Sequence, residues 1–147
     1  MRKHAKRGNE AGLARTLVWV KPQTPCIILA FGSLSAMSLE RDEELTRANR
    51  RQLPSQLPRQ IPAVLLGRMA VLKNLQGQGL GRIVYEQMEA EARAAAEHVG
   101  AAFLVVDAKD EGLKDMYTRF GFTRGRKAKA TPSAYPTRLL LPLKSLQ

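Results

Sequence analysis

A glycine-rich turn, Gln76 to Gly81 (Gln-Gly-Gln-Gly-Leu-Gly), holds the residues of this sequence best suited to chemistry. It lies between an apolar run, Ala63 to Leu72, and a long alanine-rich stretch that begins at Leu80. Glycines let backbone N–H groups approach an anion closely, and the positive end of a following helix dipole stabilises its negative charge. The turn therefore predicts a phosphate-binding site at the start of a helix.

The spacing of the glycines excludes two common phosphate sites. A Walker A loop needs Gly-x-x-x-x-Gly-Lys-Ser/Thr, which nothing in the sequence supplies. A dinucleotide fingerprint that starts at Gly77 needs a glycine where this chain has Arg82. A purely structural turn remains an alternative, although three glycines exceed what a simple strand-to-helix turn requires. The pattern that fits is Gln/Arg-x-x-Gly-x-Gly/Ala, formed by Gln76, Gly79 and Gly81.

The elements before the turn are a hairpin and a polar connection. Two apolar runs, 16–20 and 26–31, predict a hairpin with a five-residue connection, in which Trp19 and Cys26 are buried. Residues 39–52 are charged and tolerate a helix, with Glu43 and Arg47 at a favourable i,i+4 spacing. Three prolines within 53–62 predict a surface connection without regular helix.

The elements around and after the turn alternate between strand and helix. A strand is expected over 64–72, and then a helix that ends at Gly100. A buried strand follows at 103–107, and Asp110 can cap a short helix that ends at Phe120. A last strand is expected over 138–141, where Pro142 should interrupt the ladder. The helix after the turn has an apolar stripe made of Leu80, Ile83, Val84, Met88, Ala92, Ala95 and Val99. This order predicts an α/β (α+β) fold with a mixed sheet.

Composition indicates one cytoplasmic domain. The chain has 147 residues, of which 44% are hydrophobic, so a sizeable core is expected within a single domain, 1–147. A single cysteine rules out an internal disulfide framework and fits a reducing compartment. The sequence contains no apolar stretch long enough to span a membrane and no signal peptide core. It also lacks a His/Cys/Asp cluster at metal-ligand spacing, so no metal site is expected.

The charge of the chain is strongly positive. The net charge is +11, and the last acidic residue is Asp115, so the C-terminal stretch carries only basic charges. Charge of this size attracts polyanions, with nucleic acid as the leading candidate. A solvated basic surface without a specific partner is the alternative. Charge alone therefore supports a nucleic acid partner without identifying it.

Two motifs carry a resemblance to a known superfamily. Gln76, Gly79 and Gly81 resemble the pyrophosphate loop with which GNAT N-acetyltransferases bind acetyl-coenzyme A. Residues 116–122 look like the Tyr-x-x-Phe-Gly-Phe signature that follows the fourth helix in the same superfamily. The two motifs occur in the right order, with a helix and a strand between them. The resemblance implies the GNAT fold, a mixed central sheet flanked by helices.

A narrower resemblance covers nearly the whole chain. Segments 12–16, 66–71, 76–81, 107–109 and 117–122 together look like the GNAT toxins of bacterial toxin–antitoxin pairs. Those toxins acetylate the amino group of aminoacyl-tRNA and are silenced by a ribbon–helix–helix antitoxin. The resemblance therefore implies aminoacylated tRNA as the substrate and such an antitoxin as a partner. It would also explain the basic charge.

The resemblance also assigns the acetyl-coenzyme A site. Nine residues would form it, in two groups. The backbone of the strand before the turn would pair with the pantetheine arm, and an N–H near its end could polarise the thioester oxygen. The N–H groups that follow Gln76 would hold the pyrophosphate. The strand contributes Met69, Ala70 and Val71, and the turn contributes Gln76, Gln78, Gly79, Leu80, Gly81 and Arg82.

Tyr117 is the catalytic residue that the resemblance implies. The amine would attack the thioester directly, and Tyr117 would protonate the departing thiolate as a general acid. A phenol with a pKa of about 10 against a thiol at about 8.5 is a workable donor without strong driving force. A packed helix tyrosine is the alternative for Tyr117. Tyr85 and Tyr135 lie outside any such motif, and we expect both to be structural.

The general base is harder to assign. Many GNAT enzymes carry a carboxylate on the strand before the phosphate loop, whereas this strand carries Arg68 and no acid. An α-amino group, with a pKa of about 7.7 to 8.0, is partly neutral near pH 7, but a lysine at about 10.4 is not. The missing carboxylate thus favours an α-amine acceptor, with water or a distant carboxylate as a possible base. His98 is expected to be a surface residue near the helix end.

The chain begins late relative to the superfamily. GNAT domains ordinarily start with a strand and one or two helices before the hairpin, so the first strand and first helix are expected to be absent. Either the start codon is assigned late, or the chain is a short variant of the superfamily. The sheet edge exposed in this way is expected to be covered by a second subunit, as a homodimer. Two alternatives to the toxin remain: an N-acetyltransferase of another small amine or a protein N-terminus, and a non-catalytic basic binding module.

Overall fold

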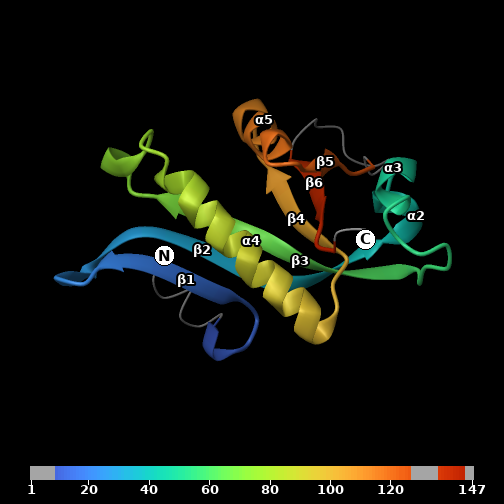
Figure 1. The fold of residues 1–147 in the computed structure, drawn as a ribbon, viewed down its shortest axis with the longest axis horizontal. Helices are drawn as coiled ribbons and strands as arrows, with labels where there is room; N and C mark the ends of the chain where they lie inside the picture. Colours follow the sequence, from blue (N-terminus) through green and yellow to red (C-terminus); the bar gives the residue numbers. More distant parts are fainter. Residues whose placement is uncertain (1–8, 127–135, 145–147) are drawn as a thin grey trace.

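A single mixed sheet of six strands organises the chain. The computed structural model describes residues 9–126 and 136–144, and its strands follow the order β1-β2-β3-β4-β6-β5 (Figure 1). All neighbouring strands are antiparallel except β3 and β4, which are parallel. Helices α4 and α5 pack on one face, and the short helices α2 and α3 lie near the other (Figure 1). The expected α+β class with a mixed sheet is confirmed.

Strand β4 (Phe103–Ala108) separates two hydrophobic cores. Side chains alternate along a strand, and Leu104 and Val106 belong to the core beneath α4 and α5. Phe103 and Val105 belong to a smaller core on the opposite face, closed by Leu45 between α2 and α3. The strand is buried on both faces, which explains its continuous apolar sequence.

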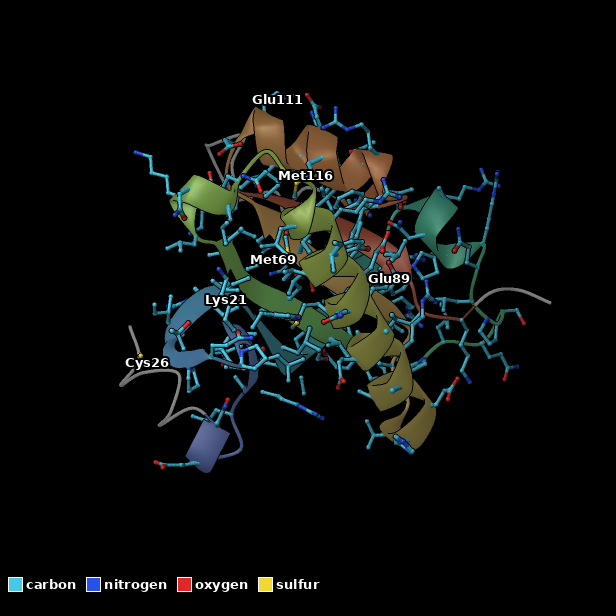
Figure 2. All side chains as sticks on the ribbon, turned by 60° about the vertical axis from the view of Figure 1, so that its left-hand side comes forward. Lys21, Cys26, Met69, Glu89, Glu111 and Met116 are labelled. Carbon is cyan, nitrogen blue, oxygen red and sulfur yellow. The ribbon has the colours of Figure 1, made fainter. Side chains whose placement is uncertain are left out.

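The hairpin is formed by β1 (Arg15–Lys21) and β2 (Thr24–Glu40). Its connection is two residues long, not five, because Lys21 and Thr24 already pair. The expected burial of Cys26 is wrong: the first four residues of β2 are exposed, and Cys26 lies at the outer end of the hairpin (Figure 2). Trp19 is partly buried against the α4 core, and its Nε1 donates to Gln87 Oε1 at 2.6 Å.

Residues 41–59 form two helical turns and a connection. Helix α2 (Arg41–Glu44) and helix α3 (Arg47–Arg50) are separate because Thr46 starts α3 with a capping box shared with Asn49. Glu43 and Arg47 therefore belong to different helices. The following strand β3 (Gln60–Val71) starts earlier than expected and includes Pro62, whose carbonyl accepts a hydrogen bond from the Ala102 N–H at 2.8 Å.

The long helix α4 (Leu80–Val99) has the expected bounds, and Gly100 ends it with a positive φ of 79°, which favours glycine. Its buried face is rotated from the predicted stripe: Ile83 and Val99 are exposed, at 52% and 83%. The rotation brings the Tyr85 ring against Tyr117 and Phe120 at the end of α5. The residues that are buried are Val84, Tyr85, Met88, Ala92 and Ala96. Figure 1 shows α4 crossing the front of β2 and β3.

The C-terminal part contains α5 (Glu111–Arg119), β5 (Thr123–Arg124) and β6 (Thr137–Pro142). Asp110 caps α5 as expected, accepting from the Leu113 N–H at 2.9 Å. Strand β5 was not anticipated, since two residues give no periodic signal. Pro142 does not interrupt the ladder: it pairs in register with Phe103, at a position where β5 no longer lines β6. None of the described helices is long and apolar enough to cross a membrane.

Candidate active site

The parallel strands β3 and β4 separate beside α4. They pair over only three residues each, Ala63–Leu65 with Phe103–Val105. Beyond that point β3 continues to Val71 and β4 to Ala108, and no further register between these two strands is found in the described residues. Figure 1 shows β4 turning toward α5 while β3 continues behind α4. The facing backbone edges of both strands are thus available to an extended ligand.

A bulge in β3 sets which side chains face this separation. Leu34 pairs with Leu66 and Ser33 with Arg68, so Gly67 is an extra residue without a partner on β2. Before the bulge Val64 and Leu66 face the α4 core, and after it Met69 and Val71 do so. Met69, labelled in Figure 2, therefore lies on the helix side of β3, whereas Ala70 is exposed.

The glycine turn ends where α4 begins. A 3-10 turn, η1 (Lys73–Leu75), follows β3, and Gly77 and Gly79 then take φ values of 77° and 81°. Gly79 is the N-cap of α4, and no side-chain hydrogen bond caps this helix. A Cβ at Gly77 or Gly79 would meet nothing within 4 Å, so the space above the turn is open. The N–H groups of the first helical turn are therefore free to bind an anion.

Three side chains of the predicted cofactor site have protein partners. Gln78 Nε2 donates to the Asn74 carbonyl at 3.5 Å, within the turn itself. Gln76 Nε2 donates to the Val71 carbonyl at 3.0 Å, which ties the turn to the end of β3. The Arg82 guanidinium donates from Nε to Glu86 Oε1 at 3.0 Å and lies 5.5 Å from the centroid of the Phe120 ring. Gln76 thus ties the turn to β3, whereas the Arg82 pair lies within α4, so the predicted contribution of Arg82 is that of its backbone N–H.

Tyr117 lies on α5 in the core that α4 covers. It is 7% exposed, and its ring makes edge-on contacts with Phe122 and Phe120 at centroid distances of 5.3 and 6.1 Å. Burial raises the pKa of Tyr117 above its ordinary value, so the hydroxyl keeps its proton at neutral pH. Burial alone accounts for this shift, with no contribution from a hydrogen bond to the hydroxyl. Tyr85 is buried as expected, and Tyr135 lies outside the described residues.

The carboxylate at the end of β4 is held in an ion pair. Asp107 receives two hydrogen bonds from Arg138, which also donates to Glu44 at 2.5 Å. The two carboxylates raise the pKa of Arg138, although its burial opposes them. The sequence does not reveal this group, because its members are far apart in the chain and carry no motif. His98 is exposed near the end of α4, as expected.

Acidic and metal-binding groups are scarce near the turn. Strand β3 carries no carboxylate, and Arg68 is exposed on it. Within residues 9–126 and 136–144, no group of three or more His, Cys, Asp or Glu side chains could hold a metal ion. The arrangement therefore offers an anion site, a free strand edge and a buried phenol, which together suit transfer of an acyl group from a phosphate-bearing donor.

Comparison with known proteins identifies the class. The model of the acetyltransferase (GNAT) family matches residues 55–122, which include β3, the glycine turn, α4 and Tyr117. This segment therefore has the sequence pattern of the GNAT acetyltransferases, a family whose acetyl donor is acetyl-coenzyme A. The glycine turn and the free edge of β3 fit the pyrophosphate and the extended pantetheine arm of that donor.

The solved structures that resemble this chain include KacT and AtaT. A Tyr-to-Phe mutant of KacT is 26% identical, with a TM-score of 0.79 over 97% of this chain and 78% of that one. AtaT complexed with acetyl-methionyl-tRNAfMet is 23% identical, with a TM-score of 0.78 over 96% and 78%. AtaTR bound with acetyl-coenzyme A is 23% identical, with a TM-score of 0.74 over 97% and 77%. At these identities the AtaT structures support the GNAT fold.

Proposed function

We propose that this chain transfers the acetyl group of acetyl-coenzyme A to the α-amino group of aminoacyl-tRNA, as the toxin of a toxin–antitoxin pair. The observation that carries the chemistry is the separation of β3 and β4 beside an uncapped glycine turn, with Tyr117 on the neighbouring helix. The tRNA is supported by the net charge of +11 and by the similarity to AtaT, which has been solved with acetyl-methionyl-tRNAfMet.

The donor is held mainly by backbone groups. The N–H groups of residues 78–82 bind the pyrophosphate at the N-terminus of α4. The edge of β3 at Met69, Ala70 and Val71 pairs with the pantetheine arm as an added strand would. An N–H near Val71 polarises the thioester oxygen, and Gln76 keeps the turn against that residue.

Transfer proceeds without a covalent enzyme intermediate. The neutral amine attacks the thioester carbon, a C–N bond forms and the C–S bond breaks. The amine loses its proton to solvent, and Tyr117 gives its hydroxyl proton to the departing thiolate. A thiol has a pKa of about 8.5, so a phenol of raised pKa delivers the proton only as negative charge develops on sulfur.

The acceptor is an amine that needs little help to lose its proton. Strand β3 supplies no carboxylate that could act as a base. The Asp107 carboxylate is held by Arg138 and is therefore not free to accept the proton of the amine. An α-amino group, with a pKa of about 7.7 to 8.0, is partly neutral near pH 7. A lysine at about 10.4 is not, which favours aminoacyl-tRNA over lysine side chains.

The biological setting follows from the same similarity. We propose that residues 1–147 act as one domain in the cytoplasm, as a homodimer, and that a ribbon–helix–helix antitoxin silences them. The similarity to AtaT, which has been solved bound to the C-terminus of the antitoxin AtaR, supports an antitoxin partner.

The test is incubation with labelled acetyl-coenzyme A and total aminoacylated tRNA. Label is expected on charged tRNA, to be absent from uncharged tRNA, and to be lost with Tyr117→Phe. Label on a small amine or a protein N-terminus would redirect the acceptor assignment. Absence of label from every acceptor would favour the non-catalytic basic module.

A further inference from the structure

A column of side chains connects the start of α4 to Tyr117. The Arg82 guanidinium lies over the ring of Phe120 at 5.5 Å, and Phe120 stacks on Tyr85 with centroids 4.4 Å apart and planes inclined by 15°. Tyr85 in turn meets the Tyr117 ring edge-on at 6.1 Å, with an interplanar angle of 69°. Tyr85 is therefore the residue of α4 whose ring contacts both Phe120 and Tyr117.

The position of Tyr85 is fixed by its surroundings. It is 2% exposed, and its ring also lies 6.0 Å from that of Phe122. Burial raises the pKa of Tyr85, and the carboxylate of Glu89 one turn along α4 raises it further. Glu89, labelled in Figure 2, is bound by Arg93, whose Nη1 donates to the Leu143 carbonyl at 2.6 Å. The ring is thus held between α5 and a polar chain that reaches the end of β6.

The hydroxyl of Tyr85 adds little to this packing. It is buried, and no described atom lies in full hydrogen-bond geometry with it, although Glu89 is close enough to raise the pKa of Tyr85 as a hydrogen-bond acceptor and as a charge. A buried hydroxyl without a partner lowers stability, so a phenylalanine would pack at least as well. The contribution of the residue therefore lies in its ring, at the contact with Tyr117.

We propose that Tyr85 is a positioning residue for acetyl transfer, acting through Tyr117. Its ring fixes the orientation of the Tyr117 ring between α4 and α5, so that the hydroxyl stays directed at the departing sulfur. The inference rests on the proposed function, in which Tyr117 is the proton donor. Proton transfer requires close alignment of donor and acceptor, so a loosened ring lowers kcat without weakening donor binding.

The test compares Tyr85→Leu with two controls, using labelled acetyl-coenzyme A and total aminoacylated tRNA. Tyr85→Leu removes the ring and is expected to lower kcat about tenfold, with KM for acetyl-coenzyme A within about twofold. Tyr85→Phe keeps the ring and should restore kcat to within about twofold of the original chain. Met88→Leu changes a buried α4 residue outside the ring cluster and should leave kcat unaltered.

A double substitution separates this inference from the proposed function. If Tyr85 acts through Tyr117, Tyr85→Leu should have no further effect on kcat once Tyr117→Phe is present. Independent, multiplying effects of the two substitutions would overturn the positioning role while leaving Tyr117 as the acid. A Tyr117→Phe chain with unaltered kcat would instead overturn the proposed role of Tyr117.

A titration tests the same contact without any acceptor. Tyr85→Leu opens space beside Tyr117, so the pKa of Tyr117 should fall toward its ordinary value of 10.0. Tyrosinate absorbance against pH, compared with and without Tyr117→Phe, identifies the Tyr117 component. An unchanged Tyr117 titration in Tyr85→Leu would contradict the inference. Circular dichroism confirms that each variant is folded over the pH range used.

Discussion

Arg138 holds Asp107 by two parallel hydrogen bonds, from Nε to Oδ1 at 2.9 Å and from Nη2 to Oδ2 at 3.0 Å. The two residues lie opposite each other on β6 and β4, and the same guanidinium reaches Glu44 on α2. The group therefore fastens α2 to the sheet at the point where β4 leaves β3.

Replacing Arg138 should destabilise the chain. Arg138→Gln leaves Asp107 and Glu44 close together without their shared cation, and we expect a loss of about 1–3 kcal/mol in the free energy of unfolding. Urea denaturation measures it. Lys114→Gln, which removes an exposed pair with Glu111, is the control and should cost less than about 1 kcal/mol. Equal losses in the two variants would show that the Arg138 ion pairs stabilise the fold no more than an exposed ion pair does.

The φ of Gly79 should matter for donor binding. Gly79→Ala places a side chain at φ 81°, which costs about 1–2 kcal/mol of stability, and it displaces the N–H groups of the first turn of α4. Gly12→Ala meets the same penalty at φ 68°, with equally open space and far from the turn in sequence. Calorimetric titration with coenzyme A should therefore show weaker binding for Gly79→Ala alone. A similar weakening in both variants would count against the pyrophosphate site.

The contact between Gly32 and Met88 should limit substitution on β2. A Cβ at Gly32 would lie 2.5 Å from Met88 Sδ, so Gly32→Ala forces α4 away from the sheet and should cost about 1–3 kcal/mol. Thermal unfolding measures the loss. Adding Met88→Ala makes room, and the pair of substitutions should then cost less than the two single losses added together. Additive losses would indicate that the crowding is relieved elsewhere.

Lowering the pH should reduce the stability that Asp42 of α2 contributes to the fold. Hydrogen bonding from Arg41 and the charges of Arg41 and Arg50 hold the pKa of Asp42 below its ordinary value of 3.8. A depressed carboxyl pKa contributes stability that is present above the unfolded pKa and lost as pH falls through the folded one. Stability should thus decline below about pH 4, and Asp42→Asn should flatten that decline. If stability declined below about pH 4 equally in the original chain and in Asp42→Asn, the proposed contribution of Asp42 would be refuted.

The sequence predicted the ends of several helices correctly because helix ends are determined by neighbouring residues. The start of α4 after the glycines, its end at Gly100 and the Asp110 cap depend on neighbouring residues, and all three are confirmed. The exposure of Cys26 was missed because an apolar strand sequence does not reveal that the hairpin extends past its covering helix. The same limit applies to the face of α4, whose rotation toward α5 depends on tertiary packing.

In the candidate site, too, the local motifs could be predicted from the sequence and the long-range contacts could not. The turn and Tyr117 belong to short motifs, so their residue types were readable from the sequence. The bulge at Gly67, the ion pairs of Arg138 and the stacking of Phe120 on Tyr85 were not, since each joins residues that are distant in the chain or depends on strand register. The roles of the individual site residues remain predictions that the experiments above address.

The short pairing of β3 with β4 has a mechanical consequence. Three residue pairs form the backbone ladder between the β1–β3 and β4–β6 halves of the described sheet. A donor lying along the free edge of β3 would act as a partial seventh strand and reinforce that seam. Hydrogen exchange should then slow on both sides of the seam when coenzyme A binds, so that the substrate also serves as a structural element.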